Sequence, residues 1–106
     1  MFCRRRNYRN TKQWQISIEE LKNKIKQGAI LIDVRSKQEY NEGHLKNAIN
    51  IPEHEIDKTI EREIPNKNQL IVLYCQSGSR SQIVYMKMTK KGYTNVYGLE
   101  GGLNMI

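Results

Sequence analysis

Residues 70–81 read Leu70-Ile71-Val72-Leu73-Tyr74-Cys75-Gln76-Ser77-Gly78-Ser79-Arg80-Ser81. The first five residues form an apolar run rich in β-branched and aromatic side chains, which is typical of a strand buried in a parallel sheet. Small polar residues follow, and then a helix-compatible segment from about residue 79 to residue 91 that Gly92 can terminate. A buried strand that runs through a short loop into a helix predicts an α/β fold.

The segments before and after this stretch repeat the alternation of helical and extended patterns. Two capping boxes, each a Ser followed three residues later by a Glu, predict helix starts at residues 17 and 36. The first helix is expected to bury an apolar face made of Ile18, Leu21 and Ile25. A further helix is expected at residues 53–64. Three short strands are expected at residues 29–34, at residues 47–52 and around residues 96–97.

Length and composition limit what the chain can be. Its 106 residues suit one compact domain, and the longest apolar run, residues 70–75, is six residues long. A membrane-spanning helix needs about 20 apolar residues, so none is expected. Two cysteines are too few for a disulfide framework, and no signal-peptide pattern begins the chain. We therefore expect a cytoplasmic protein.

The net charge of +7 is concentrated in the first residues. Residues 1–12 hold five of the 18 Lys and Arg and no acid, whereas the rest carries 13 bases and 11 acids. We expect residues 1–13 to form a flexible, solvated basic tail and residues 14–106 to form the folded domain, with no specific nucleic-acid partner. An Arg triplet after Met1-Phe2-Cys3 also resembles the cytoplasmic flank of a membrane anchor. Membrane contact of the tail, or a tether encoded upstream, is the alternative.

Cys75 directly follows the strongest predicted strand. Open parallel sheets bind ligands beyond the carboxyl ends of their strands, so this position favours a site. The small residues after it predict a loop whose backbone N–H groups point to one centre as an anion nest. The N-terminus of the next helix would add partial positive charge, which lowers the pKa of a thiol. A Cys that only fills space would need no such loop, and Cys3 is assigned no role.

This loop resembles the active-site loop of the rhodanese-like sulfurtransferases. Residues 98–102 resemble the closing glycine motif of that family. Its N-terminal signature is matched by Leu31-Ile32-Asp33-Val34-Arg35, followed by Glu39-Tyr40, Gly43-His44 and Ala48-Ile49-Asn50-Ile51-Pro52. The three motifs lie in the family's order and spacing over about residues 16 to 102, which is far more specific than a lone Cys-x-x-Gly-x-Arg pattern.

The resemblance implies a rhodanese-like fold with a mainly parallel five-stranded sheet flanked by helices. It also implies that Cys75 is the catalytic nucleophile of a sulfurtransferase. Its thiolate would take sulfane sulfur from a donor such as thiosulfate, hold it as a persulfide, and pass it to cyanide or a thiol, including that of a thioredoxin-like or other sulfur-accepting protein. The implied substrate-binding residues are Gln76, Ser77, Gly78, Ser79, Arg80 and Ser81. No cofactor and no metal are expected, because His and Cys lack ligand spacing.

The polar residues near the motifs have expected roles of their own. Arg80 could draw an anionic donor into the site, or it could turn back and brace the loop through an acid. Asp33 and Arg35 are expected to form a buried or half-buried ion pair that supports the loops around the site. His44 is expected to bond backbone groups rather than to move protons. Trp14 could cover apolar surface or stay exposed.

Three alternative functions are open at this point. The first is a protein-to-protein sulfur relay, and the second is a regulatory module without catalysis. The third is a phosphatase of the same fold, which the resemblance associates with a loop one residue longer than the four residues between Cys75 and Arg80. The chain also departs from the family because residues 103–106 lack the usual aromatic residue, so we expect an abbreviated cover of the core there.

Overall fold

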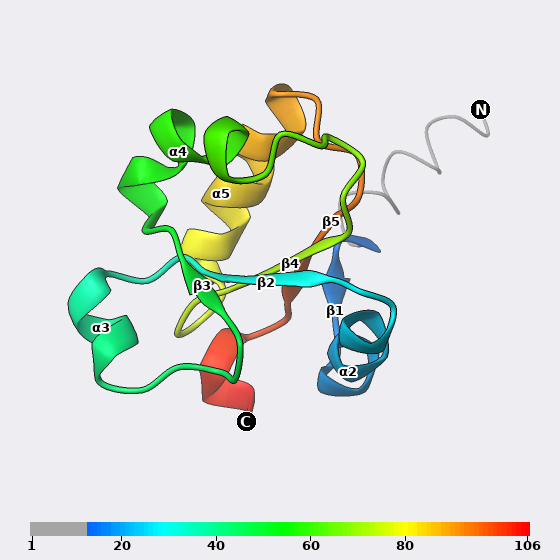
Figure 1. The fold of residues 1–106 in the computed structure, drawn as a ribbon. Helices are drawn as coiled ribbons and strands as arrows, with labels where there is room; N and C mark the ends of the chain where they lie inside the picture. The colour runs from blue at the N-terminus through cyan, green and yellow to red at the C-terminus, as the bar shows by residue number, and fades with distance from the viewer. Residues whose placement is uncertain (1–12) are drawn as a thin grey trace, which may run out of the picture.

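A computed structural model describes residues 13–106, which form a five-stranded sheet with helices on both faces (Figure 1). All strand pairs are parallel, and the strand order is β1-β5-β4-β2-β3. The strands are β1 (Gln15–Ile16), β2 (Ile30–Asp33), β3 (Ile49–Asn50), β4 (Ile71–Tyr74) and β5 (Val96–Leu99). The prediction of a mainly parallel five-stranded sheet is confirmed.

The register of the inner strands brings three carboxyl ends together. Asp33 pairs with Tyr74 on one side and with Asn50 on the other. β4 lies at the centre of the sheet and is buried along its whole length. The loops that follow β2, β3 and β4 therefore leave the sheet at the same level.

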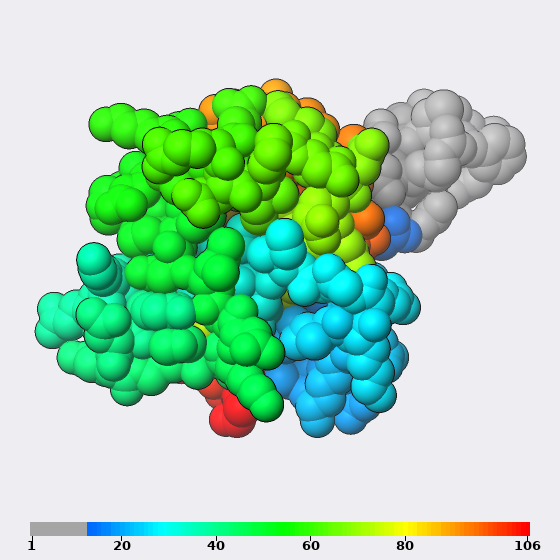
Figure 2. Space-filling model, viewed as in Figure 1, coloured from blue at the N-terminus to red at the C-terminus, as the bar shows by residue number. Residues whose placement is uncertain are grey.

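Side chains that alternate along the strands build two cores. Ile32, Leu73 and Cys75 point to one face, where α4 (Ile56–Glu63) and α5 (Ser79–Lys90) cover them. Val72 and Tyr74 point to the other face, which packs against α2 (Ile18–Lys26) and the C-terminal turn η2 (Gly102–Met105). Figure 2 shows that α2, α3 (Lys37–Asn41), α4 and the segments around β3 and before β4 form the near surface, on which little of α5 is visible.

Two helices, α2 and α3, begin where the capping boxes predict. The observed elements are α2 (Ile18–Lys26), α3 (Lys37–Asn41), η1 (Glu53–Glu55), α4 (Ile56–Glu63), α5 (Ser79–Lys90) and η2 (Gly102–Met105). Both capping boxes form with both hydrogen bonds, Ser17 with Glu20 and Ser36 with Glu39. Within residues 13–106, no helix has the length and apolar character needed to cross a membrane.

Two features differ from the sequence-based expectation. β1 was not predicted, because two residues carry no periodicity. Ile25 was expected in the core but is 44% exposed. It lines an open groove of about 330 Å³ beside Ile49, where the two-residue strand β3 leaves the edge of the sheet uncovered.

Trp14 covers apolar surface, which answers the question that the sequence left open. Its side chain is buried and stacks on Tyr85 with ring centroids 4.5 Å apart. Except for Gln13, the predicted basic tail and its flexibility, with Cys3, lie outside the described residues.

Candidate active site

Cys75 lies where the central strand β4 ends and the loop to α5 begins. Gly78 adopts a left-handed conformation with φ of 103°, which turns the chain back over the sulfur before α5 starts at Ser79. The Gly78 N–H donates to the Cys75 Sγ at 3.0 Å. The thiol has no exposed surface, so it lies at the base of this loop rather than on it.

The environment of Cys75 favours the thiolate. Burial raises the pKa of the Cys75 thiol, but polar donors outweigh this effect and hold the pKa below its usual value. These donors are the Ser81 hydroxyl and the backbone N–H groups of Ser81, Gly78 and Arg80. The N–H groups at the start of α5 have no partner within the helix and carry its partial positive charge. The arrangement supports the predicted anion nest.

Ser81 is the most unusual donor of the nest. Its hydroxyl is fully buried and makes no hydrogen bond of good geometry with any residue in the described part of the chain. It nevertheless contributes to lowering the pKa of Cys75. Of the donors around the thiol, only the Gly78 N–H has full hydrogen-bond geometry. The Ser81 hydroxyl therefore remains available to donate a hydrogen bond to the Cys75 sulfur when that sulfur is negatively charged.

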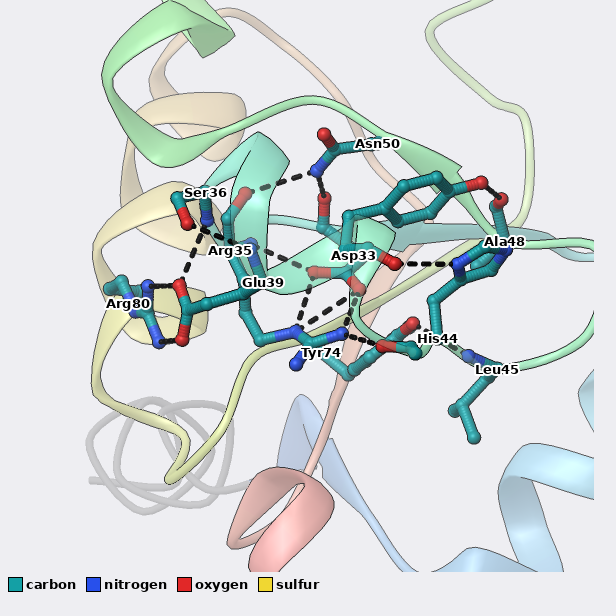
Figure 3. A network of polar contacts seen from close by, with 12 residues as sticks. Asp33, Arg35, Ser36, Glu39, His44, Leu45, Ala48, Asn50, Tyr74 and Arg80 are labelled. Carbon is teal, nitrogen blue, oxygen red and sulfur yellow. Dashed lines mark hydrogen bonds and ion pairs between the residues drawn. The ribbon is translucent and has the colours of Figure 1, made fainter.

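Arg80 braces the loop through an acid, one of the two roles left open by the sequence. Its Nη1 and Nη2 donate to Glu39 Oε1 at 2.7 Å and to Oε2 at 3.1 Å (Figure 3). Glu39 also accepts from the Ser36 backbone N–H as part of its capping box. Pairing with Arg80 lowers the pKa of Glu39 to about 2. The loop after β4 is thereby tied to α3.

Asp33 and Arg35 form the predicted ion pair, and it is buried. Arg35 Nη2 donates to Asp33 Oδ2 at 2.7 Å, and Arg35 Nε donates to Oδ1 at 3.0 Å. The same Nη2 donates to the Gly43 carbonyl at 2.6 Å, which fixes the loop after α3. The bond to Asp33 raises the pKa of Arg35. Asn50 completes the network by donating to the carbonyls of Asp33 and Arg35.

The C-terminal turn η2 holds the other side of the loop. Leu103 N–H donates to the Cys75 carbonyl, and Asn104 N–H donates to the Gln76 carbonyl, both at 2.9 Å. The Gln76 side chain donates in turn to Asn104 Oδ1 at 2.7 Å. Leu103 packs against the core on that face. The turn η2 thus supports the loop through backbone and side-chain contacts, whereas Met105 and Ile106, at 67% and 66% exposed, add little cover to the core.

The remaining predicted residues lie at the rim or outside the site. Ser77 and Ser79 are exposed, and their hydroxyls lie 3.3 Å apart. His44 bonds the Tyr40 carbonyl at 2.8 Å, as expected, and stacks on the Tyr40 ring. The sequence reasoning missed the pairing of Glu39 with Arg80 and the contact of Asn104 with Gln76. The capping box at residue 36 was a signal for Glu39 but not for this partner.

Open cavities elsewhere do not change the assignment of the site. A cavity of about 360 Å³ is lined by Tyr85, Tyr93 and Val96 among others, at the end of the sheet opposite the loop. Its lining contains no Cys, His, Lys or carboxylate side chain. We place the candidate site at Cys75, where a thiol, oriented N–H groups and a helix N-terminus converge.

Several proteins of known name are similar to this chain. The thiosulfate sulfurtransferase PspE of Escherichia coli is 37% identical over 75 residues, which cover 71% of either chain. The tRNA uridine(34) hydroxylase of Erwinia tasmaniensis is 34% identical over 79 residues, or 71% of this chain and 23% of that protein. This chain thus spans only about a quarter of some curated relatives.

Solved structures and a family model agree with these relatives. The human single-domain sulfurtransferase TSTD1 superposes with a TM-score of 0.77 at 26% identity, covering 86% of this chain and 92% of that one. A rhodanese from E. coli, solved with anions, gives a TM-score of 0.67 at 36% identity and covers 74% and 91%. The model of the rhodanese-like domain matches residues 17–106. The chain therefore belongs to the rhodanese-like domain family.

Proposed function

We propose that this chain is a sulfurtransferase that carries sulfane sulfur as a persulfide on Cys75. The observation that carries the proposal is the Gly78 N–H at 3.0 Å from the Cys75 Sγ, in a loop that holds the pKa of that thiol below its usual value. A relative of similar extent is a thiosulfate sulfurtransferase, which agrees with this chemistry.

The reaction would run in two half-reactions on one sulfur atom. In the first, the Cys75 thiolate attacks the sulfane sulfur of the donor, and the old bond to that sulfur breaks. With thiosulfate as the donor, sulfite leaves with the electron pair. In the second, an acceptor thiolate or cyanide attacks the outer sulfur of the persulfide, and the Cys75 thiolate leaves. The N–H groups at the start of α5 stabilise the sulfur anion in both half-reactions.

The direct test is intact-mass analysis after exposure to thiosulfate. The wild-type chain should gain the mass of one sulfur atom, and a reducing thiol should remove it. Cys75→Ser should gain nothing, whereas Cys3→Ser should load like the wild type. A chain that gains no sulfur from any sulfane donor, or that loads equally as Cys75→Ser, contradicts the proposal.

A protein-to-protein sulfur relay is the second candidate. Arg80 is paired with Glu39, so the site offers little electrostatic attraction to a small anionic donor such as thiosulfate. A relay predicts that loaded Cys75 transfers sulfur faster to a protein thiol, such as reduced thioredoxin, than to cyanide at equal concentration. A free enzyme predicts the reverse. Phosphatase chemistry ranks below both, because only four residues separate Cys75 from Arg80. Phosphotyrosyl turnover that disappears in Cys75→Ser would overturn this ranking.

A further inference from the structure

The one cation in the loop after Cys75 is already paired with an acid. Arg80 is the single charged residue in the loop from Cys75 to Ser81. Two of its nitrogens bond both carboxylate oxygens of Glu39, a planar bidentate pairing that matches fork to fork. The two side chains are only about one-third exposed, at 31% and 34%. An incoming anion therefore meets a closed ion pair rather than a free guanidinium.

The second guanidinium beside the loop is neutralised in the same way. Arg35 lies close enough to affect the pKa of Arg80, but its own charge is matched by Asp33 at 2.7 Å. Lys37, two residues after Arg35, does not supply a cation there either, because it lines a different cavity of about 270 Å³ with Tyr40 and Glu55. The donors that face the Cys75 sulfur are thus uncharged N–H and hydroxyl groups. These donors can stabilise the single negative charge of a sulfur anion, but no unpaired cation in the loop stabilises a second negative charge on the donor molecule.

We propose that Glu39, by pairing with Arg80, is a specificity-determining residue that makes the site prefer sulfur donors of low charge over small dianions. This inference rests on the proposed function of Cys75. Its preferred substrates are singly charged or neutral sulfane compounds, such as thiosulfonates and organic persulfides. Glu39 acts through Arg80 and does not touch the reacting sulfur, so it is a positioning residue.

Thiosulfate and methanethiosulfonate form a matched pair of donors for this question. In both, the Cys75 thiolate attacks the terminal sulfur, and the bond between that sulfur and the oxidised sulfur breaks. The electron pair leaves with sulfite from thiosulfate and with methanesulfinate from the thiosulfonate. The same persulfide forms on Cys75 in each case, and no external oxidant or reductant takes part. The donors differ by one negative charge at the end that faces the mouth of the site.

Glu39→Gln releases the charge of Arg80 with the smallest change of shape. Gln also satisfies a capping box, so α3 should keep its start. A free guanidinium at the mouth of the site, screened largely by water, favours the additional negative charge of thiosulfate by about five- to tenfold. We expect the ratio of loading rates, thiosulfate over methanethiosulfonate, to rise about five- to tenfold in Glu39→Gln and to fall again as salt is added.

The control is Glu42→Gln, which removes the same charge from the C-terminal end of α3, where Glu42 contacts Gln38 and not the loop. Its ratio should stay within twofold of the wild type. Glu39→Asp retains the charge and should keep the ratio closer to the wild type than Glu39→Gln does. Loading is measured as the mass of one sulfur on Cys75 in single-turnover time courses, with thermal unfolding to verify that each variant is folded.

The outcomes separate this inference from the proposed function. If both donors load Cys75 but Glu39→Gln leaves the ratio unchanged, or changes it no more than Glu42→Gln, Glu39 does not set specificity and the sulfurtransferase proposal stands. If Glu39→Gln is unfolded, Arg80→Gln gives the reciprocal test: the uncompensated Glu39 should lower the ratio, and an unchanged ratio overturns the inference. If neither donor loads the wild-type chain, both proposals fail.

Discussion

At the scale of single residues, the Cys75 sulfur is placed where burial and polar donors oppose each other. A buried thiol without donors would stay protonated and inert. Here the donors outweigh burial, and one of them, the Ser81 hydroxyl, is buried with no well-formed hydrogen bond. A polar group left unsatisfied in a core costs stability, and its place beside the thiol supports a role in the proposed reaction.

Ser81→Ala should separate these two contributions. Without the hydroxyl, the pKa of Cys75 rises, so the thiolate population near pH 7 falls and alkylation by iodoacetamide slows by about fivefold. The free energy of unfolding should rise by about 1 kcal/mol, because the unsatisfied hydroxyl is gone. Alkylation rates across pH in a Cys3→Ser background, with urea unfolding, measure both.

A variant that is both less stable and equally reactive would show that Ser81 has only a packing role. Ser79→Ala is the matched control, because Ser79 is exposed and its hydroxyl contacts only Ser77 among the described side chains. It should leave both the alkylation profile and the unfolding curve unchanged.

Glu39 makes the stability depend on pH. Arg80 lowers its pKa from 4.5 to about 2 in the folded chain. Since the folded pKa lies below the unfolded one, the pair stabilises the fold fully above about pH 4.5. This contribution is lost as the pH falls toward 2. It should stay below about 1 kcal/mol, because water screens a partly exposed pair.

Urea unfolding at pH 7 and pH 3 measures this contribution. Glu39→Gln should be less stable than the wild type at pH 7, and the difference should shrink at pH 3. A difference between the two proteins that is constant across this range would mean that the pair does not stabilise the fold.

At the scale of elements, the loop after β4 is held between α3 on one side and η2 on the other. The η2 contact requires Gly102, which has a φ of 62° and lies against the loop. A Cβ there would overlap the Cys75 carbonyl oxygen and lie 2.7 Å from the Gln76 carbonyl carbon. The close approach of η2 to the backbone of Cys75 therefore depends on the absence of a side chain at Gly102.

Gly102→Ala should destabilise the chain by about 3 kcal/mol, through backbone strain combined with the clash, and should slow sulfur loading of Cys75. Gly92→Ala is the matched control. Gly92 also has a positive φ, of 95°, but a Cβ there meets nothing within 4 Å. Gly92→Ala should therefore lower the free energy of unfolding by only about 1 kcal/mol, through backbone strain alone. Equal losses in the two variants, measured by urea unfolding, would contradict a specific contact of η2 with the loop.

Most of the elements, although not β1, could be predicted from the sequence because their signals are local. The apolar run of β4, the two capping boxes and the glycine after α5 each lie within a few residues of what they specify. The partner of Arg80 could not be predicted, because Glu39 lies 41 residues away and meets it only through the side-by-side placement of β2 and β4. The contact of Asn104 with Gln76 was missed for the same reason, since it spans 28 residues.

At the scale of the whole molecule, one sheet separates two cores, and the strand β1 forms one edge of that sheet beside β5. Gly98 N–H donates to the Trp14 carbonyl at 2.7 Å, and the Trp14 ring lies over Gly98 before it reaches Tyr85 on α5. A Cβ on Gly98 would lie 2.8 Å from a ring carbon of Trp14 and closer still to its neighbour. Gly98 and Trp14 thus join the segment that leads into β1 to β5.

This complementarity predicts strong coupling between the two positions. Gly98→Ala alone should cost about 2 to 3 kcal/mol, because the ring must leave its place in a close-packed interior. In a Trp14→Ala background, the same substitution has room and should cost less than about 1 kcal/mol, so the double-mutant cycle should give a coupling of at least about 1 kcal/mol. Urea unfolding followed by circular dichroism measures all four proteins, because Trp14 is the single Trp of the chain and its fluorescence is lost with it. Additive losses would show that the edge strand and its Trp are held independently of β5.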